Sequence, residues 1–444
     1  MKTPDAPDTR LIDCDDGALA RLPAFLRERL PGAPALVVAD PATWNAAGRD
    51  VWGALREAGV PTPRPCVFDA PPRSGDPDAL ARLSDALRAA AAPGAPAPVP
   101  VAVGAGSVAA LCRRAAADAG APHLVFATAA STDALAAPFD EPAGLRPPAP
   151  LPGPLAVFAE PAVLSRAPAA LASAGYGALI AGVTAGADWI LASETDASDP
   201  IDQTAWDMAQ DGADDALVRP ADVDRREPAA LGALAERLTL CGAAMQRARS
   251  ARPASGAAHD LALVWTLSRT APADGPAPRA GHFAAVGALC ALAVSARLFE
   301  EDFTPDDVAR AIGLHPAWEA REALIRSLFG DGPLAAAAMS ESRAKHLAPD
   351  ALRERLARLS SAWPELRDRV NRQLMHLPRM RAMLRAAGCP SSPAEIGLSP
   401  ARAAASVIAA QLLRRRRTVL DLAAETGRLA VCAEAVRDAF PPLP

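Results

Sequence analysis

The chain has 444 residues, 50% of them hydrophobic and 22% charged, so a mainly disordered protein is excluded and two or three domains are expected. The formal net charge of −5 argues against a broad nucleic-acid-binding surface. Lys2 and Lys345 are the only lysines among the 46 basic residues, which excludes mechanisms that need several lysines.

The first third of the chain alternates apolar runs with helical patterns. Helices are predicted at residues 46–58 and from Ser107 onward, where apolar residues recur at helical spacing. Strands that alternate with helices predict a parallel sheet with helices on both faces. Four runs have the length and composition of buried strands: residues 35–39, 101–103, 124–126 and 155–158.

From about residue 165 the strand pattern stops. Helical patterns cover residues 167–192 and 229–249, and almost everything from His282 onward. The Asp-rich residues 193–228 predict a long surface excursion. Ser399 is suited to cap a helix that has Pro400 in its first turn and continues to Leu413. We therefore predict an α/β nucleotide-binding domain at residues 1–165 and an all-α domain at residues 166–444.

The predicted strand at residues 101–103 is followed at once by Gly104, Ala105, Gly106 and Ser107. Glycines let a pyrophosphate approach the backbone, and the start of the next helix offers free N–H groups and positive potential. An ordinary tight turn is the alternative. Asp40, at the end of the first predicted strand, could bind a ribose, or it could be an ordinary turn aspartate. Together the two signals favour a nucleotide.

The chain has six histidines, and His259 and His282 are only 23 residues apart. A catalytic metal site normally has three protein ligands and one open position, so two histidines do not make one. From spacing alone, ordinary core histidines are the favoured interpretation. The sequence contains no GxSxG, HExxH or Walker motif.

The seven cysteines are scattered and form no CxxC pair, which is typical of free thiols in a reducing compartment. The first ten residues are polar and lack the basic start and apolar middle of a signal peptide. No run of 18 uncharged apolar residues predicts a membrane-spanning helix. A cytoplasmic location is expected.

Several motifs in a fixed order resemble one known family. They lie at residues 40–48 (Asp-Pro-Ala-Thr-Trp to Gly), 104–107 (Gly-Ala-Gly-Ser), 128–133, 167–168, 174–177 (Ala-Gly-Tyr-Gly), 187–189, 252–256, 395–398 and 414–422. From about residue 20 to residue 430, the chain resembles the bacterial, AraM-like branch of the sn-glycerol-1-phosphate dehydrogenases. That branch belongs to the iron-containing alcohol dehydrogenase and dehydroquinate synthase superfamily.

The resemblance implies a dehydroquinate synthase-like fold, with an N-terminal nucleotide-binding α/β domain, an all-α C-terminal domain and an active-site cleft between them. It implies reversible reduction of dihydroxyacetone phosphate with NAD(P)H, on a zinc or nickel ion held by one aspartate and two histidines. The matching residues are Asp133 for catalysis, Asp40, Gly104, Gly106, Ser107, Thr128 and Ser131 for the cofactor, and His259 and His282 for the metal.

The chain departs from the family pattern at polar positions. Ala178 replaces the aspartate that ligates the metal, and Ala258 replaces the glutamate beside the first histidine. Asp260 is a poor substitute ligand, because adjacent helical side chains point about 100° apart. Further departures are Leu263 for a histidine, Ala110 for an aspartate, Arg113 for a lysine, Gly182 for a lysine and Ala134 for a glycine. Asp188, Trp189, Arg252 and Pro253 are kept, which is typical of residues that maintain a fold.

Two hypotheses remain. The chain is either an NAD(P)-dependent dehydrogenase with impaired or altered activity, or a non-catalytic homologue that binds a nucleotide or phosphate or serves as a partner subunit. A dehydroquinate synthase is a weaker third, because that sister family uses several active-site lysines. The expected partners are a small phosphorylated substrate, and a second copy of the chain or an active paralogue. Neither nucleic acid nor a membrane span is expected.

The run Arg414 to Arg417 could be mistaken for a phosphate or nucleic-acid patch. It falls in a tail predicted to be helical, and the net charge of the chain is negative. A solvated helix end, with one arginine facing the cleft, is the favoured interpretation.

Overall fold

The structure is a computed structural model that describes residues 1–73, 75–139, 149–195 and 200–441. The chain divides into two compact units. One unit contains the sheet, the helices on its faces, helix α7 as far as Leu179, and residues 204–251. The other contains α7 from Ile180 and the chain from Arg252 onward.

The sheet of the first unit has six parallel strands in the order β1-β6-β5-β4-β2-β3. The four predicted strands are confirmed with shifts of two residues or fewer. The two strands that the sequence pattern missed, β1 and β3, are the short edge strands. The bounds are β1 Leu11–Asp13, β2 Ala35–Ala39, β3 Cys66–Val67, β4 Val99–Val103, β5 Leu124–Ala127 and β6 Ala156–Ala159.

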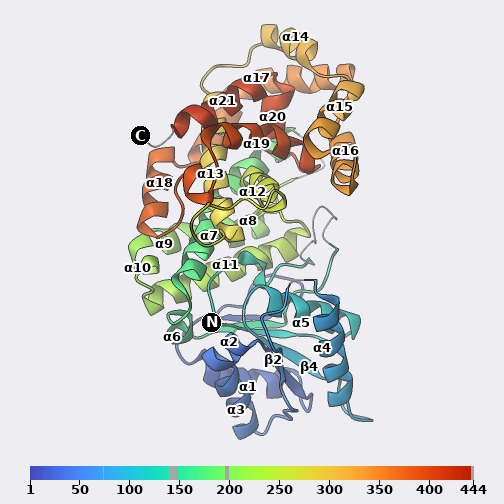
Figure 1. The fold of residues 1–444 in the computed structure, drawn as a ribbon, viewed down its shortest axis with the longest axis vertical. Helices are drawn as coiled ribbons and strands as arrows, with labels where there is room; N and C mark the ends of the chain where they lie inside the picture. The colour runs from blue at the N-terminus through green and yellow to red at the C-terminus, as the bar shows by residue number, and fades with distance from the viewer. Residues whose placement is uncertain (74, 140–148, 196–199, 442–444) are drawn as a thin grey trace. The chain divides into compact units, whose positions relative to one another are not determined.

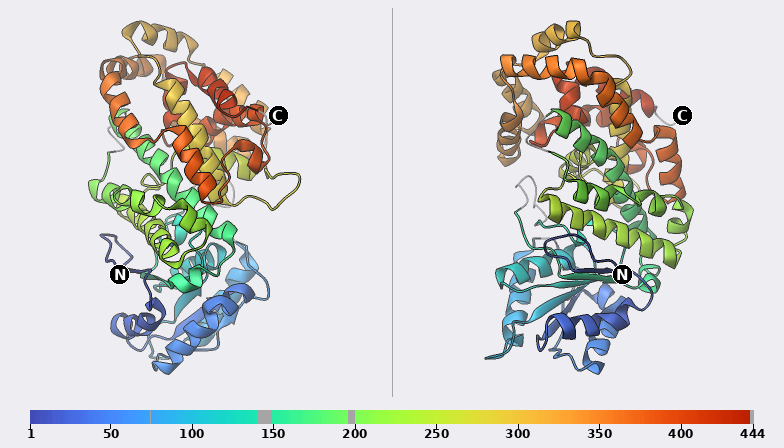
Figure 2. Two further views of the ribbon diagram at one scale, coloured as in Figure 1. Left: turned by 90° about the vertical axis from the view of Figure 1, so that its left-hand side faces the viewer. Right: turned by 180° about the vertical axis from the view of Figure 1, so that it is seen from behind.

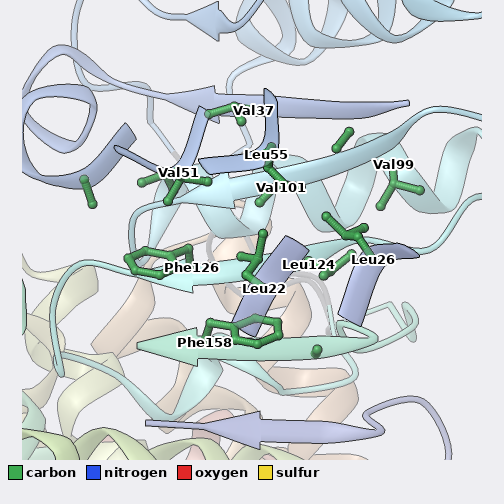
Figure 3. Packing of buried hydrophobic residues seen from close by; sticks show 14 of the residues in the cluster. Leu22, Leu26, Val37, Val51, Leu55, Val99, Val101, Leu124, Phe126 and Phe158 are labelled. Carbon is green, nitrogen blue, oxygen red and sulfur yellow. The ribbon is translucent and has the colours of Figure 1, made fainter. Parts of the chain in front are cut away.

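Helices cover both faces of this sheet (Figure 1). Helices α1 (Ala18–Arg29) and α3 (Arg49–Glu57) pack on one face, and α4 (Pro77–Ala90) and α5 (Ser107–Asp118) lie on the other. Every residue of the four central strands is buried, as expected where a parallel sheet is covered twice. Figure 3 shows the core beneath α1 and α3, formed by Leu22, Leu26, Val37, Val51, Leu55, Val99, Val101, Leu124, Phe126 and Phe158.

Most described residues of the expected surface excursion at 193–228 are exposed or half-buried, but the segment is helical rather than an irregular excursion. Helix α7 (Ala169–Thr195) runs into it, and three short helices follow: α8 (Gln203–Gln210), α9 (Ala213–Leu217) and α10 (Pro220–Asp224). The next helix, α11 (Pro228–Ala248), packs against β1 and α6 (Pro161–Leu164). This packing explains why the first compact unit extends beyond residue 165.

All regular secondary structure among the described residues of the second unit is helical, as the sequence predicts. The predicted cap is confirmed: the Ser399 side chain accepts from the Arg402 N–H, and Pro400 opens the helix. The helices are α12 (Ala257–Leu267), α13 (Ala280–Leu298), α14 (Pro305–Leu314), α15 (Trp318–Phe329), α16 (Pro333–Lys345), α17 (Pro349–Gln373), α18 (Leu377–Ala386), α19 (Pro400–Leu413), α20 (Val419–Glu425) and α21 (Leu429–Ala439), seen from two further sides in Figure 2.

Two helices, α7 and α13, are long and apolar enough to cross a membrane by length and composition alone. Their most apolar windows are 83% and 89% buried inside the protein, respectively, as in the core helices of soluble proteins. The apolar character of both helices is therefore explained by packing. All seven cysteines are free and buried, which confirms the expected free thiols.

Candidate functional site

The carboxyl ends of β2, β4 and β5 lie next to one another at one edge of the sheet. The chain leaves β2 toward β3 on one side, and then returns to place β4 on the other side of β2. Such a reversal of strand order opens the crevice in which parallel α/β sheets bind ligands. The six predicted cofactor residues all follow these three strands, so the fold brings them to a single edge: Asp40, Gly104, Gly106, Ser107, Thr128 and Ser131.

The loop between β4 and α5 has a backbone suited to glycine. Gly104 and Gly106 have φ values of +154° and +56°, which residues other than glycine rarely adopt. Helix α5 begins at Ser107, as predicted, and no side chain caps it. Its first turn also carries no acidic residue. The first N–H groups of α5 therefore remain available for an anion such as a phosphate.

Asp40 is the N-cap of the short helix α2 (Pro41–Thr43). Its Oδ1 accepts from the Thr43 N–H at 2.8 Å, and the Thr43 hydroxyl accepts from the Asp40 N–H at 3.0 Å. The turn interpretation of Asp40 thus describes its local role, while Oδ2 accepts no hydrogen bond from any described residue. Thr43, which the sequence analysis did not select, lies 3.5 Å from the position that a Gly104 Cβ would take. The Asp40 capping box and the glycine loop are therefore neighbours.

The segment after β5 carries the remaining predicted residues of the first unit. Thr128 is buried and Ser131 half-buried. Asp133 opens the 3₁₀ helix η2 (Asp133–Leu135), which the Thr132 side chain caps. Burial raises the pKa of the neighbouring Cys241 thiol to about 12, and the Asp133 carboxylate adds to that shift.

Arg113 occupies the position where the family has a lysine, and it is buried on α5. Its guanidinium donates to the carbonyls of Phe139 at 2.7 Å and Leu135 at 3.0 Å, and also to that of Ala134. These bonds tie η2 and the residues after it to α5. Arg113 therefore has a structural role in a loop that carries Asp133.

Residues 174–178 lie on α7, where the family motif loses its aspartate. A Cβ on Gly175 would lie 1.9 Å from the Ala130 carbonyl oxygen, so glycine permits α7 to approach the segment after β5. Tyr176 is fully buried, and its hydroxyl donates to the Leu217 carbonyl at 2.9 Å. The retained part of the motif is thus explained by packing. Ala178 is buried and offers only a methyl group.

His259 lies in the first turn of α12. Its Nδ1 is buried and has no hydrogen-bond partner among the described residues. Burial lowers the pKa of His259 to about 4, and the nearby Arg416 guanidinium adds to that effect. The imidazole is therefore neutral at pH 7, with a cation already beside it.

His282 lies in the first turn of α13, where its Nδ1 accepts from the Arg279 N–H at 3.3 Å. Burial lowers the pKa of His282 to about 4, so this ring is also neutral at pH 7. In a neutral imidazole whose Nδ1 accepts a hydrogen bond, the proton is on Nε2. In the structure, Nδ1 of His282 is therefore engaged by a backbone N–H rather than left open for a metal.

The arginine run is not a solvated helix end, so that expectation is wrong. Residues 414–417 link α19 to α20 outside any helix, and three of the four arginines bind carboxylates. Arg415 pairs with Glu341, and Arg417 pairs with Glu425. Arg416 Nη2 lies 2.9 Å from Ser255 Oγ and 3.3 Å from Asp260 Oδ1. Folding had to bring these carboxylates from distant helices, which local sequence does not reveal.

The retained Asp188 and Arg252 have structural roles, as the sequence analysis expects. Asp188 is buried, its Oδ2 accepts from the Ala257 N–H at 2.6 Å, and its Oδ1 accepts from the Val419 N–H at 2.7 Å. These are the first residues of α12 and α20. Burial raises the pKa of Asp188 to about 7, against the opposing effect of the two hydrogen bonds. The buried Arg252 donates to the carbonyl of Arg417.

The residues present do not fit the metal that the family resemblance implies. Across the described residues, no three or more His, Cys, Asp or Glu side chains form a group that could hold a metal ion. Ala178 offers no ligand atom, and Asp260 is bonded to Arg416. A closed site of three protein ligands is absent from the part of the chain that the structure describes.

Sequence comparison connects the chain to one family. The pattern of the iron-containing alcohol dehydrogenases matches residues 13–168. The chain is 30% identical to a glycerol-1-phosphate dehydrogenase [NAD(P)+] of Methanothrix thermoacetophila over 268 residues, covering 60% of this chain and 72% of that protein. It is 27% identical to a protein of the same name from Bacillus velezensis over 280 residues, covering 60% of this chain and 66% of that protein.

Solved structures share the fold over the whole chain. A probable glycerol dehydrogenase from Sinorhizobium meliloti 1021 aligns with a TM-score of 0.58 and 17% identity, covering 98% of this chain and all of that one. The maleylacetate reductase of Agrobacterium tumefaciens aligns with a TM-score of 0.58 and 15% identity, covering 100% of this chain and 98% of that one. At such identities the likeness concerns the fold, and it confirms the predicted architecture.

Proposed function

We propose that this chain, which belongs to the iron-containing alcohol dehydrogenase family, binds a nicotinamide dinucleotide at its glycine loop but does not perform the family's metal-dependent reduction. The relatives are named glycerol-1-phosphate dehydrogenases [NAD(P)+], and the reaction that the family resemblance implies is the reduction of dihydroxyacetone phosphate. The observation that carries the proposal is the contrast between an intact, uncapped α5 N-terminus and Ala178 at the metal aspartate position.

The sheet edge has the parts that a dinucleotide requires. The N–H groups at the start of α5 would hold the pyrophosphate, and the unbonded Oδ2 of Asp40 would accept from a ribose hydroxyl. Thr128 and Ser131 would add hydroxyl groups from the neighbouring strand end. When bound, NAD(P)H supplies a hydride for carbonyl reduction.

The helical unit lacks the parts that the reduction requires. A divalent ion stabilises the alkoxide that forms when a hydride reaches a carbonyl, and the described residues do not assemble its ligands. His282 is engaged by the Arg279 N–H, and the Arg416 guanidinium stands close to His259. The proposal therefore keeps nucleotide binding and excludes turnover of the family type.

We also propose a cytoplasmic location. Seven buried, unpaired thiols are typical of proteins from a reducing compartment, because disulfides persist mainly in oxidising ones. Fractionation of the native host should place the protein with the cytoplasmic enzymes.

The first test is cofactor binding by the purified full-length chain, measured by calorimetry with NADH and NADPH. One of the two should bind, and Gly106→Ala should weaken that binding by about tenfold, because alanine is strained at a φ of +56° and shifts the loop. Gly53→Ala is the matched control, since Gly53 lies on α3 with open space at its Cβ and should leave affinity unchanged. Absence of binding at millimolar NADH and NADPH would refute the proposal.

The second arm measures metal and turnover. The purified chain should hold little zinc or nickel and should not oxidise NADH with dihydroxyacetone phosphate, even when either metal is added. Ala178→Asp combined with Ala258→Glu should increase metal retention, whereas Ala178→Asn combined with Ala258→Gln, which adds no charge, should not. Near-stoichiometric metal in the natural chain, lost in the His259→Ala, His282→Ala double variant, is the contrary result.

A further inference from the structure

The helical unit contains a cavity of about 310 Å³ that belongs neither to the glycine loop nor to the histidine motifs. It lies among α15, α16, α19 and α20, with residues from the ends of α14 and α21, and Figure 1 shows these helices grouped together. Pockets for small ligands typically measure about 300–1,000 Å³. The cavity is therefore large enough for a small molecule.

Buried polar groups form one side of this cavity. Lys345 Nζ lies 2.6 Å from Asp421 Oδ1, and Gln411 Nε2 donates to the same oxygen at 2.9 Å. Arg321 Nη2 donates to Gln411 Oε1 at 2.6 Å. Asp421 Oδ2 is already occupied, because it accepts from the N–H of Thr418 at 2.9 Å. The Asp421 carboxylate therefore pairs directly with Lys345, and it accepts hydrogen bonds from Gln411 and Thr418 rather than from Arg321.

The other carboxylate of the cavity wall, Glu425, is also taken. Arg417 binds both of its oxygens, at 2.6 and 2.7 Å, and Arg355 adds a contact of 3.2 Å. The cluster thus contains the cations Arg321, Lys345, Arg355 and Arg417 against the carboxylates Asp421 and Glu425, with the buried Asp260 interacting with Lys345 from outside the cavity wall. A buried excess of positive charge is costly unless an anion balances it.

Arg321 is the cation of this cluster that forms no direct ion pair with a described carboxylate. It is only 8% exposed and lines the cavity, and its Nε has no hydrogen-bond partner among the described residues. Burial lowers the pKa of Arg321, and the Asp421 and Glu425 carboxylates offset that effect only in part. A ligand carboxylate in the cavity would supply a direct partner.

The remaining wall of the cavity is apolar. Ile408, Leu412 and Leu429 line it, together with Leu314 and Leu324. The last two are 60% and 40% exposed, so they form an apolar rim at the mouth of the cavity. Exposed leucines beside a cationic cavity are what a ligand with an apolar body would cover.

We propose that this cavity binds a small amphipathic anion, with a carboxylate head against Arg321 and an apolar chain or ring along the leucines. The buried positive charge would bind the carboxylate of the ligand, and the exposed leucines would cover its apolar part. This site does not depend on the proposed nucleotide function, since it uses none of the residues of the glycine loop.

Octanoate is the probe for the test, with 1-octanol and octylamine as neutral and cationic controls. Calorimetry on the full-length chain should show saturable octanoate binding, and the two controls should bind at least tenfold more weakly, because only the carboxylate pairs with Arg321. Octanoate should also raise the melting temperature. NADH should neither compete with octanoate nor change its affinity.

Two variants locate the site. Arg321→Gln should weaken octanoate binding by about tenfold to a hundredfold, whereas Arg326→Gln, an exposed arginine on the same helix that pairs with Glu322, should not. Leu324→Asp changes an exposed position, so it should fold normally and abolish binding by repulsion. Equal affinity for octanoate and octanol, no binding at millimolar octanoate, or full binding by folded Leu324→Asp would each overturn the proposal.

Discussion

The glycine loop (residues 104–107) lies in the first, sheet-containing unit, and the histidine region around His259 and His282 lies in the second, helical unit. The two have departed from the family pattern in different ways. In the loop, the groups expected to bind a ligand are backbone N–H groups at the start of α5, and the glycine conformations that expose them are kept. In the histidine region, the chemistry of the family depends on side chains, and Ala258 has replaced one of them, just as Ala178 has replaced the metal aspartate on the part of α7 that belongs to the sheet unit. Substitution abolishes a site made of side chains more easily than one made of backbone.

The same contrast explains which residues of the family pattern are kept in the helical unit. Asp188 and Arg252 bond to backbone groups and hold helix starts and loops in place. The Arg416 guanidinium donates a hydrogen bond to the Asp260 carboxylate and lies close to His259. Hydrogen bonds and ion pairs between protein groups therefore hold the histidine region together, and the positive charge beside His259 is the Arg416 guanidinium. Three predictions test this interpretation.

The largest effect is expected for Asp188→Ala. The change leaves the N–H groups of Ala257 and Val419 buried without an acceptor, which should lower the free energy of unfolding by about 3–5 kcal/mol. Urea denaturation measures this quantity. Asp368→Ala, at an exposed position in the middle of α17, should change it by less than about 1 kcal/mol. A fully stable Asp188→Ala protein would show that Asp188 is not what holds these helix starts.

The second prediction compares two buried histidines. His123, in the sheet unit, resembles His259 in that one of its ring nitrogens, Nε2, is buried without a hydrogen-bond partner among the described residues. Burial, with Arg113 nearby, lowers the pKa of His123 to about 3, against 6.5 in the unfolded chain. Because the unfolded state takes up the proton first, stability should fall as pH drops below about 6.5.

His123→Leu removes this source of acid sensitivity. Between pH 6.5 and 4 the natural chain should lose about 3 kcal/mol more than the variant, measured by denaturant titration at each pH. His376→Gln, which changes an exposed histidine, should follow the natural chain. Parallel curves for His123→Leu and the natural chain would mean that burial of His123 does not govern acid stability. The neutral state of His259 could not then be inferred from burial alone.

The smallest effect is expected for Arg113→Lys, which restores the family's residue type. A lysine cannot reproduce the guanidinium bonds to the carbonyls of Phe139, Leu135 and Ala134, so stability should fall by about 2 kcal/mol. Arg114→Lys, the exposed neighbour that pairs with Asp118, should cost less than about 0.5 kcal/mol. Unchanged stability with altered NADH affinity would instead give Arg113 a role in cofactor binding.

Local patterns predicted most of the fold, with specific exceptions. The central strands at 35–39 and 101–103 are continuous apolar runs, and both were located within two residues. The edge strands β1 and β3 have three and two residues, too few to show a pattern. The polar residues 193–228 contain short helices because α11 and its neighbours pack on the sheet unit, which composition does not reveal.

The candidate sites divide in the same way. A glycine loop between a strand and a helix is a local motif, so Gly104, Gly106 and Ser107 were identified before their geometry was known. The partners of Arg415 and Arg416 and the cavity around Arg321 depend on contacts between distant helices. No periodicity in the sequence reports such contacts.

The sequence by itself determined the central strands, the glycine loop and the loss of the metal aspartate at Ala178, because each is a property of neighbouring residues or of a single position. Only the tertiary structure decided that Arg416 stands close to His259, that His282 has its Nδ1 engaged, and that Arg321 faces a cavity whose carboxylates pair directly with other cations. The physical reason is that charge balance in a protein interior is set by whichever side chains folding brings together, and burial makes each missing or added partner costly.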